Sequence, residues 1–148
     1  MKVAEVMTVP PVCVPPDATL AEVARLMAEC AVGSVLVVEG GELRGIVTDR
    51  DLAVRGVGSG LSVGARVESV MSSQVVSVGA AHDLQQAYLT FRRTGVRRLP
   101  VLDAGRVVGV VTVDDLFLDV FRRLADLLGP VAWSVLHEPP GPPPETGA

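Results

Sequence analysis

Two stretches of the sequence place a hydroxyl and a carboxylate three residues apart, a spacing that can hold a small polar ligand. Thr48 and Asp51 lie in LRGIVTDRDL, and Thr112 and Asp115 lie in VVGVVTVDDL. Each threonine ends an apolar run and each aspartate opens a predicted helix, whose free backbone N–H groups attract phosphate. One carboxylate can accept hydrogen bonds from both hydroxyls of a vicinal diol. We therefore predict that Asp51 and Asp115 recognise a ribose, with Thr48 and Thr112 near the ribose or its phosphate.

The same residues also have a purely structural interpretation. An aspartate at a helix start caps the helix and complements its dipole whether or not a ligand is present. The pair recurs at the same position of both stretches, which favours the ligand interpretation. Both interpretations stay open at the level of sequence.

The two stretches belong to a longer internal repeat. Sliding the sequence by 64 positions aligns residues 3–52 with residues 67–116 without a gap, and 14 of the 50 pairs are identical. The matches include Met7 with Met71 and Gly45 with Gly109, which a valine-rich composition cannot explain. A repeat of this length indicates two copies of one supersecondary unit.

Each copy predicts the same order of elements. A short strand at 12–14 or 76–78 precedes a helix that begins in TLAE or DLQQ, which are helix-capping patterns. Two apolar runs joined at Gly40–Gly41 or Ala104–Gly105 then form a hairpin, and another helix follows the threonine. The predicted fold class is α+β, with two pseudo-symmetric βαββα repeats packed sheet to sheet and a C-terminal amphipathic helix.

The predicted boundaries give repeat 1 residues 1–58, a glycine-rich linker residues 59–66, and repeat 2 with its extended helix residues 67–129. An apolar stripe through Leu116, Val120, Leu124 and Leu128 runs along that helix, where it covers the core or makes a dimer contact. Gly129–Pro130 should end the helix. Residues 130–148 should form a C-terminal segment and a proline-rich tail without fixed structure.

The composition argues against several classes of function. A formal net charge of −4 disfavours general nucleic-acid binding. No apolar stretch of membrane-spanning length and no signal-peptide pattern is found in the sequence, so we expect a cytoplasmic protein with no membrane partner. Cys13 and Cys30 lack the spacing of a zinc or redox pair, and we expect both to be small buried apolar residues.

Catalytic and metal chemistry are not indicated. No nucleophile and base stand in a known pattern, and no phosphate-binding glycine motif occurs, so we predict that the protein is not an enzyme and has no catalytic residue. The acidic residues Asp49, Asp51, Asp114 and Asp115 are more typical of helix caps than of a metal site, so we predict no metal.

The doubled pattern resembles a known family. VMT and VMS open the two copies, which continue into GSVLVVEGGELRGIVTDRDL and GVRRLPVLDAGRVVGVVTVDDL. Together these segments resemble a pair of cystathionine-β-synthase-type (CBS) domains, or Bateman module, over residues 3 to about 120. The resemblance implies two clefts between the repeats, frequent dimerisation into a disc, and binding of AMP, ADP or ATP, or less often S-adenosylmethionine or NAD(H).

The resemblance also suggests roles for further residues. In the family, basic residues at the position of Arg97 and Arg98 often reach the ligand phosphate, whereas copy one has Gly33 and Ser34 there. We therefore expect unequal phosphate affinity in the two clefts, with at most one arginine entering because strand residues alternate in direction. A solvated charge pair is the alternative. An adenine ring would need an apolar slot, for which the candidates are Val12, Val14, Val76, Val78, Ile46 and Val110.

These expectations describe a non-catalytic regulatory module that senses an adenine nucleotide and requires no cofactor. It would act on an unidentified effector protein or through its own homodimer. The alternative function is a ligand-free module for dimerisation or partner docking, which would use the C-terminal helix.

Overall fold

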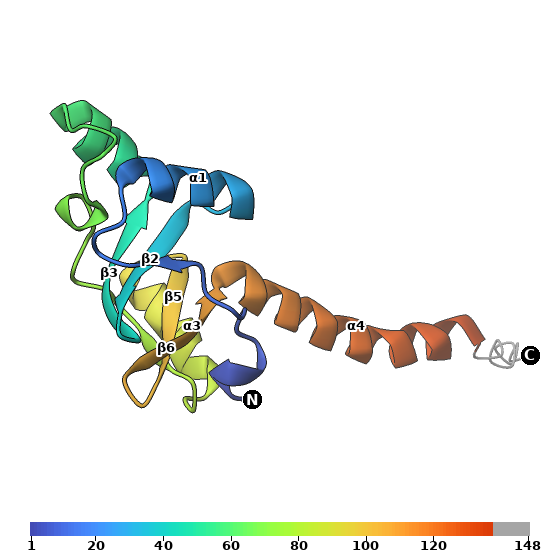
Figure 1. The fold of residues 1–148 in the computed structure, drawn as a ribbon. Coiled ribbons are helices and arrows are strands. Elements are labelled where there is room, and N and C mark those ends of the chain that lie inside the picture. Colours follow the sequence, from blue (N-terminus) through green and yellow to red (C-terminus); the bar gives the residue numbers. More distant parts are fainter. Residues whose placement is uncertain (138–148) are drawn as a thin grey trace, which may run out of the picture.

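The computed structural model describes residues 1–137, with side chains up to residue 129. It contains two three-stranded mixed sheets (Figure 1), in each of which a short strand pairs in parallel with the middle strand and the third strand is antiparallel. The predicted fold class is thereby confirmed. The strands are β1 (Cys13–Val14), β2 (Ser34–Glu39) and β3 (Glu42–Thr48) in one sheet, and β4 (Val78–Gly79), β5 (Arg98–Asp103) and β6 (Arg106–Thr112) in the other.

Helices accompany both sheets in the same order. α1 (Leu20–Cys30) packs on the first sheet and α3 (Leu84–Thr94) on the second. β3 leads into α2 (Asp49–Asp51), a π-helical turn (Leu52–Gly56) and a 3₁₀ turn (Val57–Ser59), whereas β6 leads into the single long helix α4 (Val113–His137). Short 3₁₀ turns at Val3–Glu5 and Val67–Ser69 open the two repeats.

The hairpins form where the turn residues predict them. Gly40 and Gly41 have φ of 60° and 84°, and Ala104 and Gly105 have φ of 49° and 77°. Tight hairpin turns need positive φ at both central positions, which glycine adopts without steric cost. Both hairpins therefore bring the threonine at the end of the third strand beside the start of the second strand, with Ser34 opposite Thr48 and Arg98 opposite Thr112.

The two covering helices begin at different kinds of cap. Thr19 and Glu22 form the predicted reciprocal box at α1, because each side chain accepts a hydrogen bond from the other's backbone N–H. At α3, the Asp83 carboxylate accepts a hydrogen bond from the N–H of Gln85 at 3.0 Å. This bond lowers the pKa of Asp83, and the nearby amino terminus adds to the effect.

The two hydrophobic cores exchange their opening segments. The first core, under α1, contains Val67 and Val70 from the start of the second repeat, and the second core, under α3, contains Val3 from the start of the first. All three side chains are fully buried. Each repeat therefore completes the core of the other, which makes the pair one folding unit although the sequence reads as two copies.

Backbone pairing repeats this exchange at the sheet edges. Thr8 pairs with Val110 of β6, and Ser72 pairs with Ile46 of β3, each through two backbone hydrogen bonds of 2.8–3.1 Å. The two pairs are related by the same 64-residue offset as the sequence repeat. Each repeat thus places an extended segment against the sheet of the other.

α4 is longer than the sequence predicts. Gly129–Pro130 was expected to end it, but the backbone remains helical to His137. A proline inside a helix removes one backbone hydrogen bond and bends the axis, and the helix can continue beyond it. The helix extends away from the two sheets (Figure 1). The prediction that residues 130–148 lack fixed structure is therefore wrong for residues 130–137, and residues 138–148 lie outside the described residues.

The expectation for the cysteines is wrong. Cys13 and Cys30 are both exposed free thiols. Cys13 lies on the two-residue strand β1 and Cys30 at the last position of α1, so both are at the margins of their elements. The cores are instead filled by branched aliphatic side chains, Met27 and Phe91.

Candidate functional site

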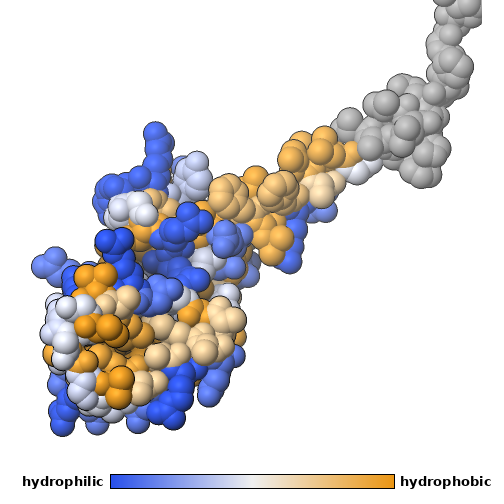
Figure 2. Space-filling model, turned by 90° about the horizontal axis from the view of Figure 1, so that it is seen from above, coloured by the Kyte–Doolittle hydropathy of each residue, from blue (hydrophilic) through white to orange (hydrophobic). Residues whose placement is uncertain are grey.

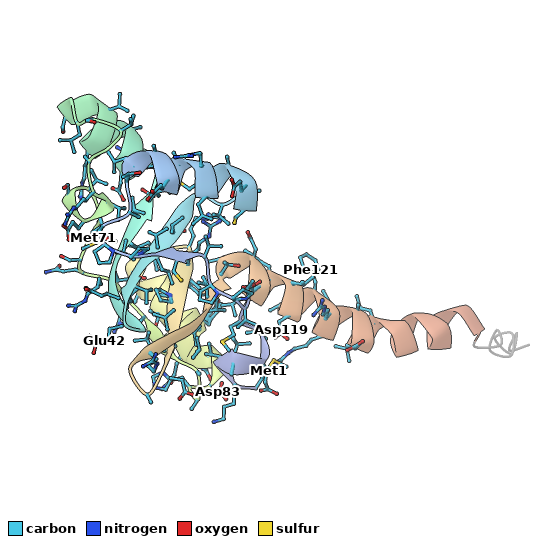
Figure 3. The ribbon with its side chains drawn as sticks, in the orientation of Figure 1. Met1, Glu42, Met71, Asp83, Asp119 and Phe121 are labelled. Atoms are coloured by element: carbon cyan, nitrogen blue, oxygen red, sulfur yellow. The ribbon has the colours of Figure 1, made fainter. Side chains whose placement is uncertain are left out.

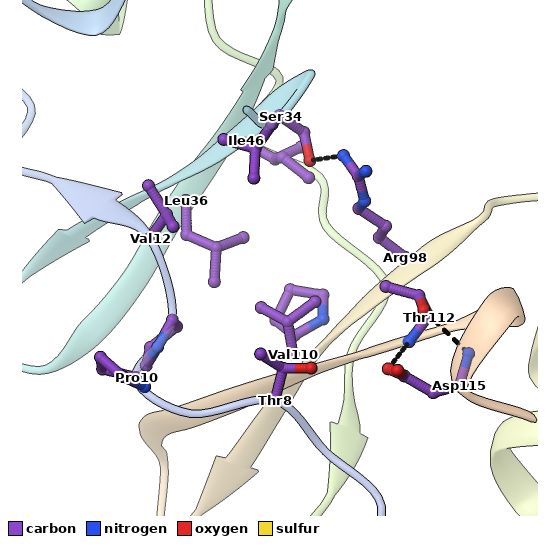
Figure 4. Close-up of a pocket in the computed structure, with 13 residues that line it drawn as sticks. Thr8, Pro10, Val12, Ser34, Leu36, Ile46, Arg98, Val110, Thr112 and Asp115 are labelled. Atoms are coloured by element: carbon purple, nitrogen blue, oxygen red, sulfur yellow. Dashed lines mark hydrogen bonds between the residues drawn. The ribbon is translucent and has the colours of Figure 1, made fainter. Parts of the chain in front are cut away.

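A first cavity of about 250 Å³ lies between the two sheets (Figure 4). Its apolar walls come from both sheets and from the exchanged segment of the first repeat, and its polar groups include Arg98, Thr112 and Asp115. The apolar lining residues are Pro10, Pro11, Val12, Val32, Leu36, Ile46, Pro100 and Val110. An apolar slot with a few convergent polar groups is the usual form of a small-molecule site.

A second cavity of about 460 Å³ opens at the strand ends where the two hairpins meet. It is lined by Thr48 and Asp49 of the first repeat and by residues 112–114 of the second. The exchanged segment of the second repeat contributes Gln74, Val75 and Val76, the counterparts of Pro10, Pro11 and Val12. Its volume lies within the range of roughly 300–1,000 Å³ usual for ligand pockets, and the first cavity is slightly smaller.

The two Thr-x-x-Asp motifs fold into the same local structure. The Asp51 carboxylate accepts a hydrogen bond from the Thr48 N–H at 2.9 Å, and the Asp51 N–H donates to Thr48 Oγ1 at 3.1 Å. The corresponding distances for Thr112 and Asp115 are 2.8 and 3.1 Å. Both motifs are therefore reciprocal capping boxes, as the structural interpretation predicts. A capping box occupies one carboxylate oxygen and leaves the other for a further partner.

The surroundings of the two carboxylates differ. Oδ1 of Asp51 lies 3.8 Å from Nε of Arg55, one helical turn later, and Asp51 is not among the residues that line either cavity. Asp115 lines the first cavity, and no ion pair with it is found among the described residues. The position that corresponds to Arg55 is Asp119, which cannot pair with Asp115 and lies 3.0 Å from Arg123.

The two arginines are placed differently, and only Arg98 lines the cavity of Asp115. Arg97 lines the second cavity together with Thr48 of the other repeat, so it does not join the Asp115 carboxylate of its own repeat. Arg98 lines both cavities. Its Nη1 donates to Oγ of Ser34, its own counterpart in the repeat, at 2.9 Å. The limit of one arginine per cleft is also wrong, because Arg97 precedes β5 and is not bound by the alternation of a strand.

The apolar candidates divide into two groups. Val12, Ile46 and Val110 line the first cavity, and Val76 and Ile46 line the second. The assignment of Val14 and Val78 is corrected, because Val14 packs against the first core and Val78 is buried in the second. Val12 and Val76, two positions earlier, line the cavities, whereas Val14 and Val78 are already paired in the short strands β1 and β4.

Sequence reasoning missed several lining residues. Thr8, Pro10 and Pro11 line the first cavity because their segment crosses to the sheet of the other repeat. Gln74 and Val75 do the same in the second cavity. The 64-residue offset would have linked these two segments, but no local pattern indicates that each belongs to the sheet of the other copy.

The chemistry available in the cavities is that of binding. The first combines a guanidinium, a carboxylate and the hydroxyls of three residues with apolar walls. The second has the guanidinium groups of Arg97 and Arg98 and the carboxylates of Asp49 and Asp114. Within the described residues, no three His, Cys, Asp or Glu side chains gather as a metal site would require. None of the described helices is both long and apolar enough to cross a membrane.

Comparison with known proteins agrees with this architecture. Residues 3–57 and 67–121 each match the CBS domain family, so the chain belongs to the CBS domain proteins and carries a tandem pair, a type of regulatory module. It is similar to the CBS domain-containing protein YhcV of Bacillus subtilis, with 38% identity over 114 residues that cover 77% of this chain and 81% of YhcV.

Solved structures of two further relatives have the same fold. Hypoxic response protein 1 of Mycobacterium tuberculosis is 29% identical over 76% of this chain and 80% of its own. The crystal structure of Hypoxic Response Protein I with two coordinated zinc ions superposes with a TM-score of 0.72 over 78% of this chain and 96% of that one, at 28% identity. The CBS domain protein PAE2072 of Pyrobaculum aerophilum, complexed with AMP, gives a TM-score of 0.70 at 27% identity, covering 78% and 90%.

Proposed function

We propose that the chain is a non-catalytic sensor that binds an adenine nucleotide, AMP, ADP or ATP, in the first cavity. The observation that carries this proposal is that Asp115 and Arg98 line the same apolar slot between the sheets. The AMP complex of PAE2072 supports the choice of ligand class.

Each part of a nucleotide would have a matching group. The adenine ring would lie between the apolar side chains of the two sheets, because a flat aromatic ring gains most from an apolar slot. The ribose hydroxyls would donate to the free oxygen of Asp115, and the phosphate would accept from Arg98. Binding would act on an effector protein or on self-assembly only to the extent that the ligand prefers one state of the module.

A thermal-shift series tests this function. AMP, ADP, ATP, S-adenosylmethionine and NADH are each added to the wild-type chain and to Asp115→Ala. A ligand at 100 times its dissociation constant stabilises the folded state by about 2.7 kcal/mol, which raises the melting temperature measurably. The proposal requires such a rise with at least one adenine nucleotide and a clearly smaller rise in Asp115→Ala at the same ligand concentration. No rise with any of the five compounds would contradict it.

The exposed face of α4 favours a second function, self-association. Phe117, Val120, Phe121, Leu124, Leu127 and Leu128 recur at steps of three and four and are each 46–65% exposed. They form an apolar strip along the helix (Figure 2). Phe121 and Asp119 mark the apolar and the charged side (Figure 3). This spacing is typical of helices that pair with a like helix, so we propose a second copy of the chain as the partner.

Light scattering distinguishes this second function. Phe121→Glu with Leu128→Glu places charges in the strip and should reduce a dimeric mass to that of one chain. Arg122→Glu on the opposite side of the same helix is the matched control and should leave the mass unchanged. A wild-type mass of one chain, or equal masses in all three proteins, would count against self-association through α4.

A further inference from the structure

Arg98 occupies the wall that separates the two cavities. It is one of four residues that line both, together with Ser34, Ile46 and Thr112. Figure 4 shows its side chain reaching across to Ser34 of the other repeat, to which Nη1 donates at 2.9 Å. Arg98 is an exposed residue in this arrangement. It is therefore free to turn toward an anion on either side.

The other charged groups belong to one cavity each. Asp115 lines the first cavity alone, and Arg97, Asp49 and Asp114 line the second alone. A ligand phosphate in the first cavity therefore has Arg98 as its only arginine among the lining residues. In the second cavity a phosphate has Arg97 as well, but it also faces two carboxylates that oppose an anion.

One guanidinium cannot serve two phosphates fully. It carries one positive charge, and a phosphate that binds it takes two of its five N–H donors in parallel hydrogen bonds. A phosphate in one cavity would draw the side chain to that side, break the bond to Ser34 and leave less positive charge for the other cavity. A second phosphate would then meet the first anion without the cation that compensates for it.

We propose that Arg98 makes the two cavities compete for phosphate-bearing ligands, so that binding of one anionic nucleotide removes the phosphate recognition of the other cavity. This inference rests on the proposed nucleotide binding and adds a rule of occupancy to it. Neutral nucleosides do not need the guanidinium, so they escape the competition. Each chain then binds one nucleotide at concentrations where it could bind a nucleoside in both cavities.

Comparison of AMP with adenosine isolates the phosphate contribution in each cavity. Nuclear magnetic resonance titration follows the backbone amides of Val12 and Leu36 for the first cavity and of Val75 and Val76 for the second. Adenosine gives the affinity of each cavity for the nucleoside alone. The ratio of adenosine to AMP dissociation constants is then the phosphate preference, in which unequal affinities for adenine and ribose cancel.

The decisive variant is Arg97→Gln, in which Arg98 is the one arginine left among the residues that line the two cavities. The cavity that fills first should prefer AMP over adenosine by about tenfold or more, since a charge-assisted hydrogen bond contributes that much. The other cavity should show no such preference. Arg98→Gln should abolish the preference of the first-filled cavity, and its side chain is exposed, so the fold is not at risk.

The outcomes separate the two proposals. A preference of tenfold or more in both cavities of Arg97→Gln would overturn the competition, and so would a preference that survives in Arg98→Gln or that appears in neither cavity of Arg97→Gln. Failure of both AMP and adenosine to move any of the four amides in the wild-type chain would instead reject nucleotide binding itself.

Discussion

The two Thr-x-x-Asp motifs form the same hydrogen bonds, but they differ in the residue that lies one helical turn beyond the aspartate. In the first repeat Arg55 lies 3.8 Å from the Asp51 carboxylate, and in the second the same position is Asp119, which lies 3.0 Å from Arg123. Asp115 is consequently the carboxylate that faces a cavity without an ion pair among the described residues. A duplicated motif therefore need not give a duplicated site, because the residues around the motif decide which groups are free to bind.

The largest expected effect on stability comes from substitutions where the exchanged segments pack against β3 and β6. A Cβ on Gly45 would lie 2.7 Å from the carbonyl oxygen of Ser72, and one on Gly109 would lie 2.9 Å from that of Thr8. Because backbone atoms cannot yield as a side chain can, Gly45→Ala and Gly109→Ala should each lower the free energy of unfolding by about 1–3 kcal/mol. Urea unfolding measures both.

Gly129→Ala is the control for this pair. Its added Cβ would meet nothing within 4 Å beyond the backbone of its own helix, so alanine should be neutral or stabilising by up to about 1 kcal/mol. Equal stability of Gly45→Ala, Gly109→Ala and the wild type would show that the segments do not lie against the sheets as described.

A second prediction tests whether the residue four positions after each aspartate decides whether its carboxylate can bind a ligand. Asp119→Arg places a cation four residues after Asp115, as Arg55 stands to Asp51. Pairs at this spacing contribute about 0.3–0.5 kcal/mol, so AMP affinity should fall by about twofold. Isothermal calorimetry measures this change, and Arg55→Gln, which leaves Asp115 untouched, is the control. A rise in affinity in Asp119→Arg would show that phosphate attraction outweighs competition for the carboxylate.

The smallest expected difference lies at the caps of α1 and α3. The pKa of Asp83 is lowered chiefly by the hydrogen bond from the Gln85 N–H, so its carboxylate stabilises the fold above the unfolded-state pKa. That contribution is lost as the pH falls through the folded-state pKa. Asp83→Asn should therefore be less stable than the wild type near neutral pH, and the difference should close in acid.

Thr19 provides the uncharged counterpart. Its hydroxyl does not titrate, so Thr19→Ala should lower stability by a similar amount at neutral and acid pH. Melting temperatures of both variants across the acid range test the contrast. A difference between Asp83→Asn and the wild type that stays constant with pH would mean that the cap does not depend on the carboxylate charge.

Local patterns in the sequence predicted much of the fold. The turns at Gly40–Gly41 and Ala104–Gly105 and the capping box at Thr19 depend on neighbouring residues alone, and the structure confirms them. The exchange of Val3 and Val67 between the two cores could not be predicted in this way, because the sequence around a buried valine does not indicate which sheet it packs against. The helix beyond Gly129 was not predicted because a Gly-Pro pair is a local stop signal, whereas the continuation of α4 past it is not marked by the neighbouring residues.

Prediction of the site was limited in the same way. Thr112 and Asp115 were identified from the repeat and Arg98 from the family resemblance, and all three line one cavity. The sequence did contain the signal that separates Asp51 from Asp115, since an aspartate and an arginine four residues apart in a helix pair readily. The position of Arg97 in the opposite cavity could not be predicted, because it depends on how the two hairpins meet.

The most direct test of the account is AMP titration of Asp115→Ala beside Asp51→Ala. Each variant removes one of two carboxylates with the same capping role, so the two should lose similar stability. By isothermal calorimetry, Asp115→Ala should weaken AMP binding about tenfold or more through the lost charge-assisted hydrogen bonds, and Asp51→Ala by less than about threefold. Equal losses in the two variants, or the larger loss in Asp51→Ala, would contradict the account.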